Sequence, residues 1–92
     1  MKDFTFYCFD EPKIGWLEVP VELIRRYNVK DVITSDSYID GSYVYLETKV
    51  DAVMFLDKLR EWGVTFSIVH DHDWTFEDSD IREYTRYDPK YI

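Results

Sequence analysis

Hydrophobic and polar positions change their spacing several times along the chain, and each change predicts a different element. The run Phe4–Phe9 (FTFYCF) is rich in aromatic residues and precedes Asp-Glu-Pro-Lys, a composition typical of a turn. Gly15–Val19 (GWLEV) predicts a second short strand, whose last residue precedes a proline and is therefore biased toward extended backbone. We expect Trp16 in this strand to be a core residue rather than a contact residue.

Residues 20–28 predict a short helix. Pro20 can occupy the first helical position, and Asn28 can end the helix in the left-handed conformation. The expected inner side chains are Val21, Leu23, Ile24 and Tyr27.

The clearest local signal is Asp40-Gly41, a residue pair favoured in tight hairpin turns. Because side chains alternate along a strand, the return strand should place its residues on two faces. We expect one face to carry Tyr43, Tyr45 and Glu47, and the other Val44 and Leu46.

A second helix is predicted over 51–62, since Thr48 and Asp51 have the spacing of a capping box and Gly63 is a suitable C-terminal stop. Apolar residues then recur at helical spacing. They are Ala52, Phe55, Leu56, Leu59 and Trp62. Residues 64–69 predict a further strand.

The resulting order is β-β-α-β-β-α-β, followed by a C-terminal arm. Such an order favours an α+β fold, with a mostly antiparallel sheet and two helices on one face. We expect residues 1–92 to form a single domain, in which 74–92 is an extended arm that docks through its aromatic side chains. Ile81, Tyr84 and Tyr87 could alternatively share one side of a helical turn.

Composition narrows the kinds of partner. With 92 residues, 46% of them hydrophobic and 18% aromatic, the chain can form one small folded domain. Its net charge of −8 argues against direct binding of nucleic acid or of an anionic membrane, and permits a partner with a basic surface. The single cysteine allows no internal disulfide, and we expect neither a signal peptide nor a membrane span and therefore a cytoplasmic protein.

Four segments carry a resemblance to a known family. They are GWLEVP (15–20), ITSDSYIDGSYVYLE (33–47), DAVMFL (51–56) and IREYTRY (81–87). Together they resemble a family of small uncharacterised proteins of bacterial phages and other mobile elements, in which Gly-Trp-x-x-Val-Pro, Ser-Tyr, Tyr-Leu-Glu and Ile-Arg-x-Tyr occur in this order. The first strand and the doubled His-Asp are not parts of that pattern. The resemblance implies a setting in a bacterial host rather than a chemistry.

Both histidines lie in the stretch SIVHDHDWTFEDSD (67–80). On a continuing strand, His70 and His72 would share one face and could bind one metal ion. A metal site needs three or four protein ligands, which Cys8 does not complete and Glu47 could complete only through the fold. We favour a strand that ends near His70 and continues as a solvated loop, with no cofactor.

The sequence gives little support for a catalytic site built from a Cys–His pair, from paired carboxylates or from a phosphate-binding loop. Cys8 with His70 would need an exposed thiolate, whereas Cys8 shares a strand face with Phe4 and Phe6 and should point inward. Paired carboxylates would need a cleft that shifts their pKa values. The three glycines form no phosphate-binding loop. We therefore do not expect an enzyme.

Binding is the remaining interpretation. Acidic residues beside exposed aromatic residues could dock on a basic groove, with the aromatic side chains as anchors and the acids steering the approach. The predicted contact residues are Asp71, Asp73, Trp74, Phe76, Glu77, Asp78 and Asp80. The hypothesis is a non-enzymatic inhibitor of a host protein that handles nucleic acid, such as a defence nuclease complex. Two alternatives stay open: a small-ligand or metal-binding module using His70 and His72, and a homodimer formed through a tyrosine-rich face and an edge strand.

Overall fold

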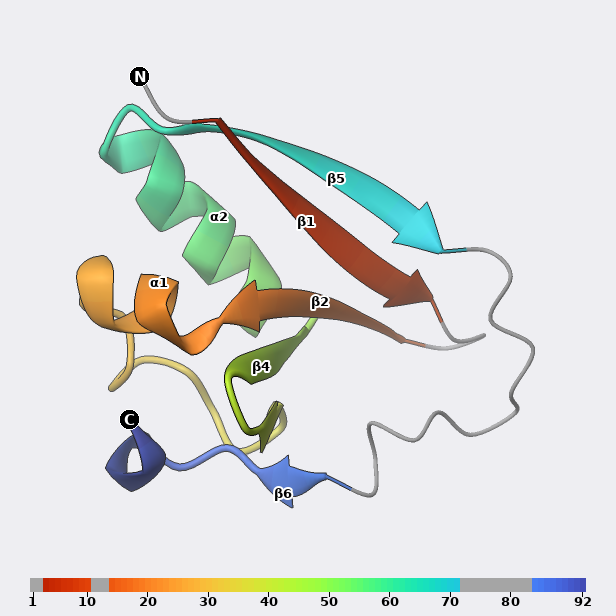
Figure 1. Ribbon diagram of the computed structural model, residues 1–92, viewed down its shortest axis with the longest axis vertical. Coiled ribbons are helices and arrows are strands. Elements are labelled where there is room, and N and C mark those ends of the chain that lie inside the picture. Colours follow the sequence, from red (N-terminus) through yellow and green to blue (C-terminus); the bar gives the residue numbers. More distant parts are fainter. Residues whose placement is uncertain (1–2, 11–13, 72–83) are drawn as a thin grey trace.

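The computed structural model describes residues 3–10, 14–71 and 84–92 (Figure 1). Its elements are β1 (Asp3–Asp10), β2 (Gly15–Pro20), α1 (Val21–Arg26), β3 (Tyr38–Asp40), β4 (Tyr43–Glu47), α2 (Asp51–Glu61), β5 (Thr65–Asp71), β6 (Thr85–Arg86) and the 3₁₀-helix η2 (Pro89–Tyr91). The six strands form one sheet in the order β5-β1-β2-β4-β3-β6. Of the described pairings, β1 with β5 is parallel and the other four are antiparallel. The predicted α+β fold is confirmed.

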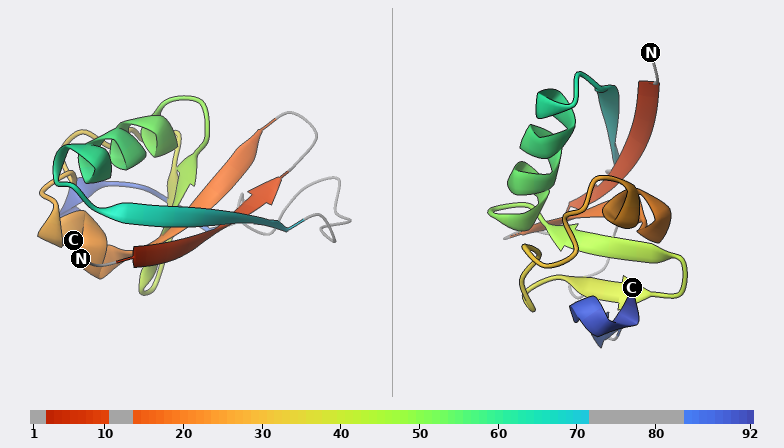
Figure 2. Two further views of the ribbon diagram at one scale, coloured as in Figure 1. Left: turned by 90° about the horizontal axis from the view of Figure 1, so that it is seen from above. Right: turned by 90° about the vertical axis from the view of Figure 1, so that its left-hand side faces the viewer.

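One face of the sheet carries the main core. Cys8 pairs with Leu17, which in turn pairs with Leu46, so their side chains lie in one row across three strands. Both helices contribute to the same core, α1 through Ile24 and α2 through Phe55, each completely buried. Figure 2 shows α2 lying above strands β1 and β5 on this side. The helices therefore cover one face, as the sequence predicted.

The opposite face holds a smaller aromatic cluster. Trp16, Tyr38 and Tyr45 are buried there, and Phe9 and Tyr84 pack against them. Trp16 contacts Tyr38 edge to face, with 5.3 Å between the ring centroids. Trp16 is thus a core residue, as expected, but it belongs to the face that α1 and α2 leave uncovered.

Local backbone preferences explain the ends of α1 and the β3–β4 hairpin. Asn28 has φ +57°, which confirms its predicted left-handed conformation. The prediction that Pro20 begins the helix is wrong, because Pro20 is the last residue of β2 and α1 starts at Val21.

The predicted hairpin turn is displaced by one residue in the structure. Asp40 pairs with Tyr43, so the turn consists of Gly41 and Ser42. Gly41 has φ +60° at the first turn position, which suits a turn with glycine there.

The start of α2 differs from the predicted capping box. No side chain caps the helix from position 50, and the carboxylate of Glu47 instead accepts hydrogen bonds from the backbone N–H groups of 49, 50 and 51. Thr48 is engaged elsewhere, since its hydroxyl accepts a hydrogen bond from Gly15 N at 3.1 Å. Trp62 was expected in the apolar stripe of this helix, but it lies beyond the last helical residue and is 63% exposed.

The end of the chain completes the sheet. β6 pairs antiparallel with β3, placing Arg86 opposite Tyr38. Tyr87 is buried in the main core, and its hydroxyl donates a hydrogen bond to the carbonyl oxygen of Lys30. Of the arm expected at 74–92, residues 74–83 lie outside the described part of the structure.

Candidate protein-binding face

The predicted contact residues fall mostly outside the described part of the chain. Asp71 is the last residue of β5, where its backbone pairs with Phe9. The others lie in the range 72–83, which the structure does not describe. They are Asp73, Trp74, Phe76, Glu77, Asp78 and Asp80, together with His72 of the alternative metal site.

The structure places Cys8 and His70 side by side. The two residues pair across the parallel strands β1 and β5, and Cys8 is buried as predicted whereas His70 is exposed. Both line a cavity of about 180 Å³. The remaining lining residues are Leu17, Thr48, Ala52, Val53, Leu56 and Ile68. This largely apolar hollow suits an apolar group about the size of one side chain.

Glu47 is the third ligand considered for a metal site. Its carboxylate accepts hydrogen bonds from backbone N–H groups at the start of α2, and the residue is only 5% exposed. Within the described ranges, His, Cys, Asp and Glu side chains nowhere gather in threes in a way that could hold a metal ion.

Asp51 forms a second buried carboxylate site, and its role is structural. Its Oδ2 accepts hydrogen bonds from Thr34 N at 3.1 Å, Thr34 Oγ1 at 2.8 Å and Ser37 Oγ at 2.6 Å. Ser37 Oγ also accepts a hydrogen bond from the backbone N–H of Glu47 at 3.1 Å. Asp51 and Ser37 are fully buried, so this network fastens the loop before β3 to the start of α2.

The face of the sheet without helices presents a continuous row of side chains across the strands. Reading from β1, Tyr7 pairs with Glu18, Glu18 with Tyr45, Tyr45 with Tyr38, and Tyr38 with Arg86. Directly opposed residues on neighbouring antiparallel strands have Cβ atoms about 5 Å apart. The row therefore places aromatic rings and charged groups in direct succession.

The exposed part of this surface combines tyrosines with carboxylates, and we call it the tyrosine–carboxylate face. It comprises Tyr7, Glu18, Asp40 and Tyr43. Tyr7 is 50% exposed and lies opposite the half-buried Glu18. Tyr43 is 42% exposed and lies opposite the exposed Asp40.

Sequence reasoning anticipated part of this face. The alternation along 43–47 correctly predicted that Tyr43 and Tyr45 share a side. The same alternation could have assigned Tyr7 to the side opposite Cys8. Nothing local, however, shows that Tyr7 meets Glu18, because that contact depends on how β1 and β2 pair.

Electrostatics fix the orientation of Glu18. The Tyr45 hydroxyl donates a hydrogen bond to Glu18 Oε2 at 3.0 Å. Burial raises the pKa of Tyr45 well above its ordinary value, and the negative charge of Glu18 raises it further. The phenol therefore stays protonated near neutral pH and remains a donor to the carboxylate.

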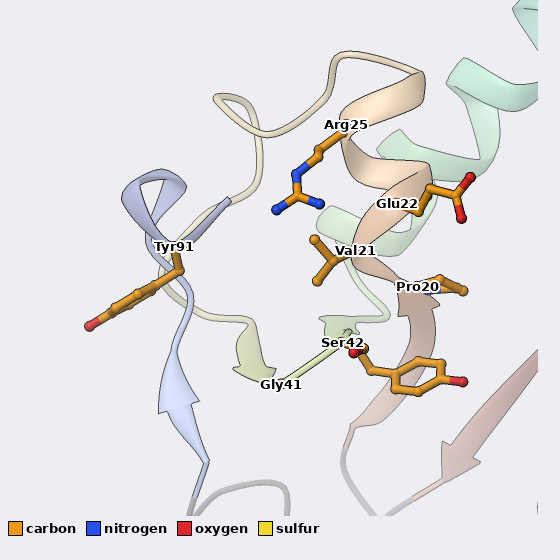
Figure 3. A pocket seen from close by; sticks show the side chains of 8 residues that line it. Pro20, Val21, Glu22, Arg25, Gly41, Ser42 and Tyr91 are labelled. Carbon is orange, nitrogen blue, oxygen red and sulfur yellow. The ribbon is translucent and has the colours of Figure 1, made fainter.

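A cavity of about 370 Å³ borders the tyrosine–carboxylate face at Tyr43 (Figure 3). It lies between the first residues of α1, the β3–β4 turn and η2. Figure 3 shows Arg25 reaching from α1 toward this space, whereas the ring of Tyr91 points away from it. With Arg25, Glu22 and the Ser42 hydroxyl on its walls, the cavity offers polar contacts beside the exposed tyrosines.

Comparison of the chain with protein-family models, with curated proteins and with solved structures found no match. In the part of the chain that the structure describes, no helix combines the length and the apolar character needed to cross a bilayer.

Proposed function

We propose that this chain is an acidic, non-enzymatic binding protein of a phage or mobile element. It inhibits a host protein that handles nucleic acid, such as a defence nuclease complex, by occupying its basic surface. The inhibitor acts in the cytoplasm of the bacterial host. The observation that carries the proposal is the tyrosine–carboxylate face, where two exposed tyrosines each lie opposite a carboxylate.

Physical chemistry supports this use of the face. Tyrosine supplies a large contact area with little conformational entropy to lose, and it is enriched at the centres of protein interfaces. Carboxylates beside the rings complement lysine and arginine, and the net charge of −8 steers the approach to a basic partner. The acidic segment 71–80, which begins at the last residue of β5, adds to the same negative charge. The resemblance to mobile-element proteins supplies the setting.

The test is an affinity pull-down from bacterial host lysate with the tagged chain, eluted by a salt gradient and identified by mass spectrometry. We expect one basic, nucleic-acid-handling complex that elutes at moderate salt, because charge contacts between exposed groups are screened. The double variant Tyr7→Ala/Tyr43→Ala should lose it. Trp62→Ala is the matched control, since Trp62 is exposed but does not belong to the tyrosine–carboxylate face. A partner without a basic surface, or binding that does not respond to salt, contradicts the proposal.

A second candidate function is a small-ligand module, favoured by the apolar cavity that Cys8 and His70 share. Here a small apolar ligand occupies this cavity, which His70 helps to line. Replacing His70 and His72 with alanine should abolish ligand uptake and leave the fold intact. Unchanged uptake by the folded double variant argues against this function.

Self-association through β5 is the remaining alternative. Among the described strands, β5 is terminal in the sheet and pairs along one side only, with β1. Residues 65–70 contain no lysine, glutamate, aspartate or proline that would discourage edge-to-edge pairing. A dimer that persists at high salt on size-exclusion chromatography and dissociates in Val69→Lys would favour this alternative over inhibition.

A further inference from the structure

The row that crosses the helix-free face begins with a tyrosine and a carboxylate and ends with a tyrosine and an arginine. At the β1 side, Tyr7 lies opposite Glu18, and at the β6 side, Tyr38 lies opposite Arg86. The first pair thus offers an aromatic surface and a negative charge, and has no cation opposite it on the neighbouring strand. The Tyr7 ring is half accessible to solvent, whereas Tyr38 at the other end of the row is buried.

One arginine of the chain already packs on this face. The guanidinium carbon of Arg86 lies 5.4 Å from the centroid of the Tyr38 ring, a cation–π distance. Arg86 Nη1 also donates a hydrogen bond to the carbonyl oxygen of Ser35 at 2.9 Å. An arginine therefore already packs over a tyrosine of this row and uses its N–H groups on a nearby oxygen. Tyr7 with Glu18 presents the same two elements, a ring and an oxygen acceptor.

Glu18 is prepared for such a ligand. Its Oε2 is held by the Tyr45 hydroxyl at 3.0 Å, while the residue stays partly accessible to solvent. A carboxylate that is already oriented loses little conformational entropy when it accepts a second partner. Arginine matches this arrangement better than lysine. Its planar guanidinium can stack on a ring and donate two N–H groups to a carboxylate, whereas an ammonium group is compact and strongly hydrated.

We propose that Tyr7 and Glu18 form a subsite for one arginine side chain of the basic partner. The guanidinium lies over the Tyr7 ring and donates hydrogen bonds to the Glu18 carboxylate. This assignment rests on the proposed function, because it identifies the residue by which the partner's basic surface is recognised. Its chemistry is nevertheless testable without that partner.

The test is an NMR titration of the full chain with the capped peptide acetyl-Gly-Arg-Gly-amide, and with its lysine and citrulline counterparts. The arginine peptide should shift the Tyr7 ring resonances and the backbone amide resonance of position 18, which every variant retains, with an affinity on the order of millimolar. The lysine peptide should bind about fivefold more weakly, and the uncharged citrulline peptide should give no shift.

Variants separate the two halves of the subsite. Glu18→Gln keeps an oxygen that can accept from Tyr45 but removes the charge, and should weaken the arginine peptide about fivefold. Tyr7→Phe keeps the ring and should bind as the parent chain does, whereas Tyr7→Ala should not bind. Asp57→Asn, at an exposed carboxylate of α2, is the matched control and should change nothing. Equal affinity for arginine and lysine, or undiminished binding by Glu18→Gln, overturns the subsite.

The peptide titration and the pull-down can fail independently. Arginine-selective binding without a nucleic-acid-handling partner in the lysate upholds the subsite and contradicts the proposed function. Recovery of such a partner equally well by the parent chain and by Glu18→Gln upholds the function and overturns the subsite.

Discussion

Buried polar side chains are the residues on which this small fold depends most sharply. Asp51 and Ser37 are completely buried, and the hydrogen bond between them replaces contacts with water. A buried carboxylate that accepts three hydrogen bonds is stable only while all three donors face it. The sequence offers no sign of this network, because the donors come from a loop that is distant along the chain from α2.

Asp51→Asn should lower the free energy of unfolding by roughly 2 kcal/mol, because the amide oxygen that takes the place of Oδ2 no longer carries the charge that strengthens its three hydrogen bonds, and the N–H₂ group takes the buried Oδ1 position, which has no hydrogen-bond partner among the described residues. Urea denaturation followed by circular dichroism measures this change. Asp57→Asn, on the exposed side of the same helix, should cost less than about 0.5 kcal/mol even though it loses an ion pair with Arg60. Equal changes in the free energy of unfolding for the two substitutions would show that the Asp51 network stabilises the fold no more than an exposed ion pair does.

The Tyr87 phenol predicts how stability depends on pH. Burial raises its pKa to about 12, with smaller contributions from the charges of Asp31, Asp88 and Asp51. In the unfolded chain the phenol ionises near pH 10. The neutral phenol therefore contributes stability that is complete below pH 10 and is lost as the pH rises through 12.

Urea denaturation at pH 8, 10, 11 and 12 tests this dependence. Tyr87→Phe should be about 1 kcal/mol less stable at pH 8, because the Lys30 carbonyl loses its donor. Its stability should then fall less steeply than that of the parent chain between pH 10 and 12. Parallel curves for the two proteins would rule out Tyr87 as a source of the alkaline loss.

At the scale of the elements, the ends of the helices and turns are set by a few backbone conformations. Asn28, Gly41 and Gly63 have positive φ, and each lies where the chain must reverse or stop. Gly63 follows α2 and leads the chain into β5. A Cβ atom built at Gly63 would meet nothing within 4 Å, so any cost of substitution there comes from the backbone conformation itself.

Gly63→Ala should accordingly destabilise the protein by about 1 kcal/mol, because φ +71° is unfavourable for a residue with a Cβ atom. Gly63→Asn should lose less, since asparagine tolerates the left-handed region better. Thermal denaturation of the three proteins gives the order glycine, asparagine, alanine from most to least stable. An alanine variant as stable as the parent would mean that the backbone relaxes out of this conformation.

At the scale of the whole molecule, two clusters share one sheet. The main core lies between the sheet and both helices, whereas Trp16 and its neighbours occupy the other face. Alternate residues of β2 belong to the two clusters, Leu17 and Val19 to one and Trp16 to the other. Neither cluster can lose its strands while the other keeps them, so the domain should unfold as one unit.

This cooperativity can be measured by two probes. In the variant Trp62→Phe/Trp74→Phe, Trp16 is the remaining tryptophan and its fluorescence reports the helix-free face. Circular dichroism at 222 nm reports the helices on the other face. The two urea curves should coincide, with a slope of about 1 kcal/mol per molar urea. Separate midpoints would show that the faces unfold independently.

The sequence by itself determined the strands and helices from β1 to β5 and the sides on which most of their residues lie. The left-handed Asn28, the helical stop at Gly63, the inward Cys8 and the opposite sides of Tyr43 and Val44 all follow from local rules. Those rules concern backbone conformation and the two-residue or 3.6-residue spacing of side chains, so neighbouring residues carry the whole signal.

Tertiary structure decided which strands and helices contact one another, and through which of their faces. The capping of α2 by Glu47, the parallel pairing that joins Cys8 to His70, and the pairing of Tyr7 with Glu18 depend on residues distant in sequence. Register between strands is selected by how much apolar surface all elements bury together, and a slip of one residue would exchange the two faces. The candidate binding face exists only in that register, which is why alternation could assign its tyrosines to a side but could not place carboxylates opposite them.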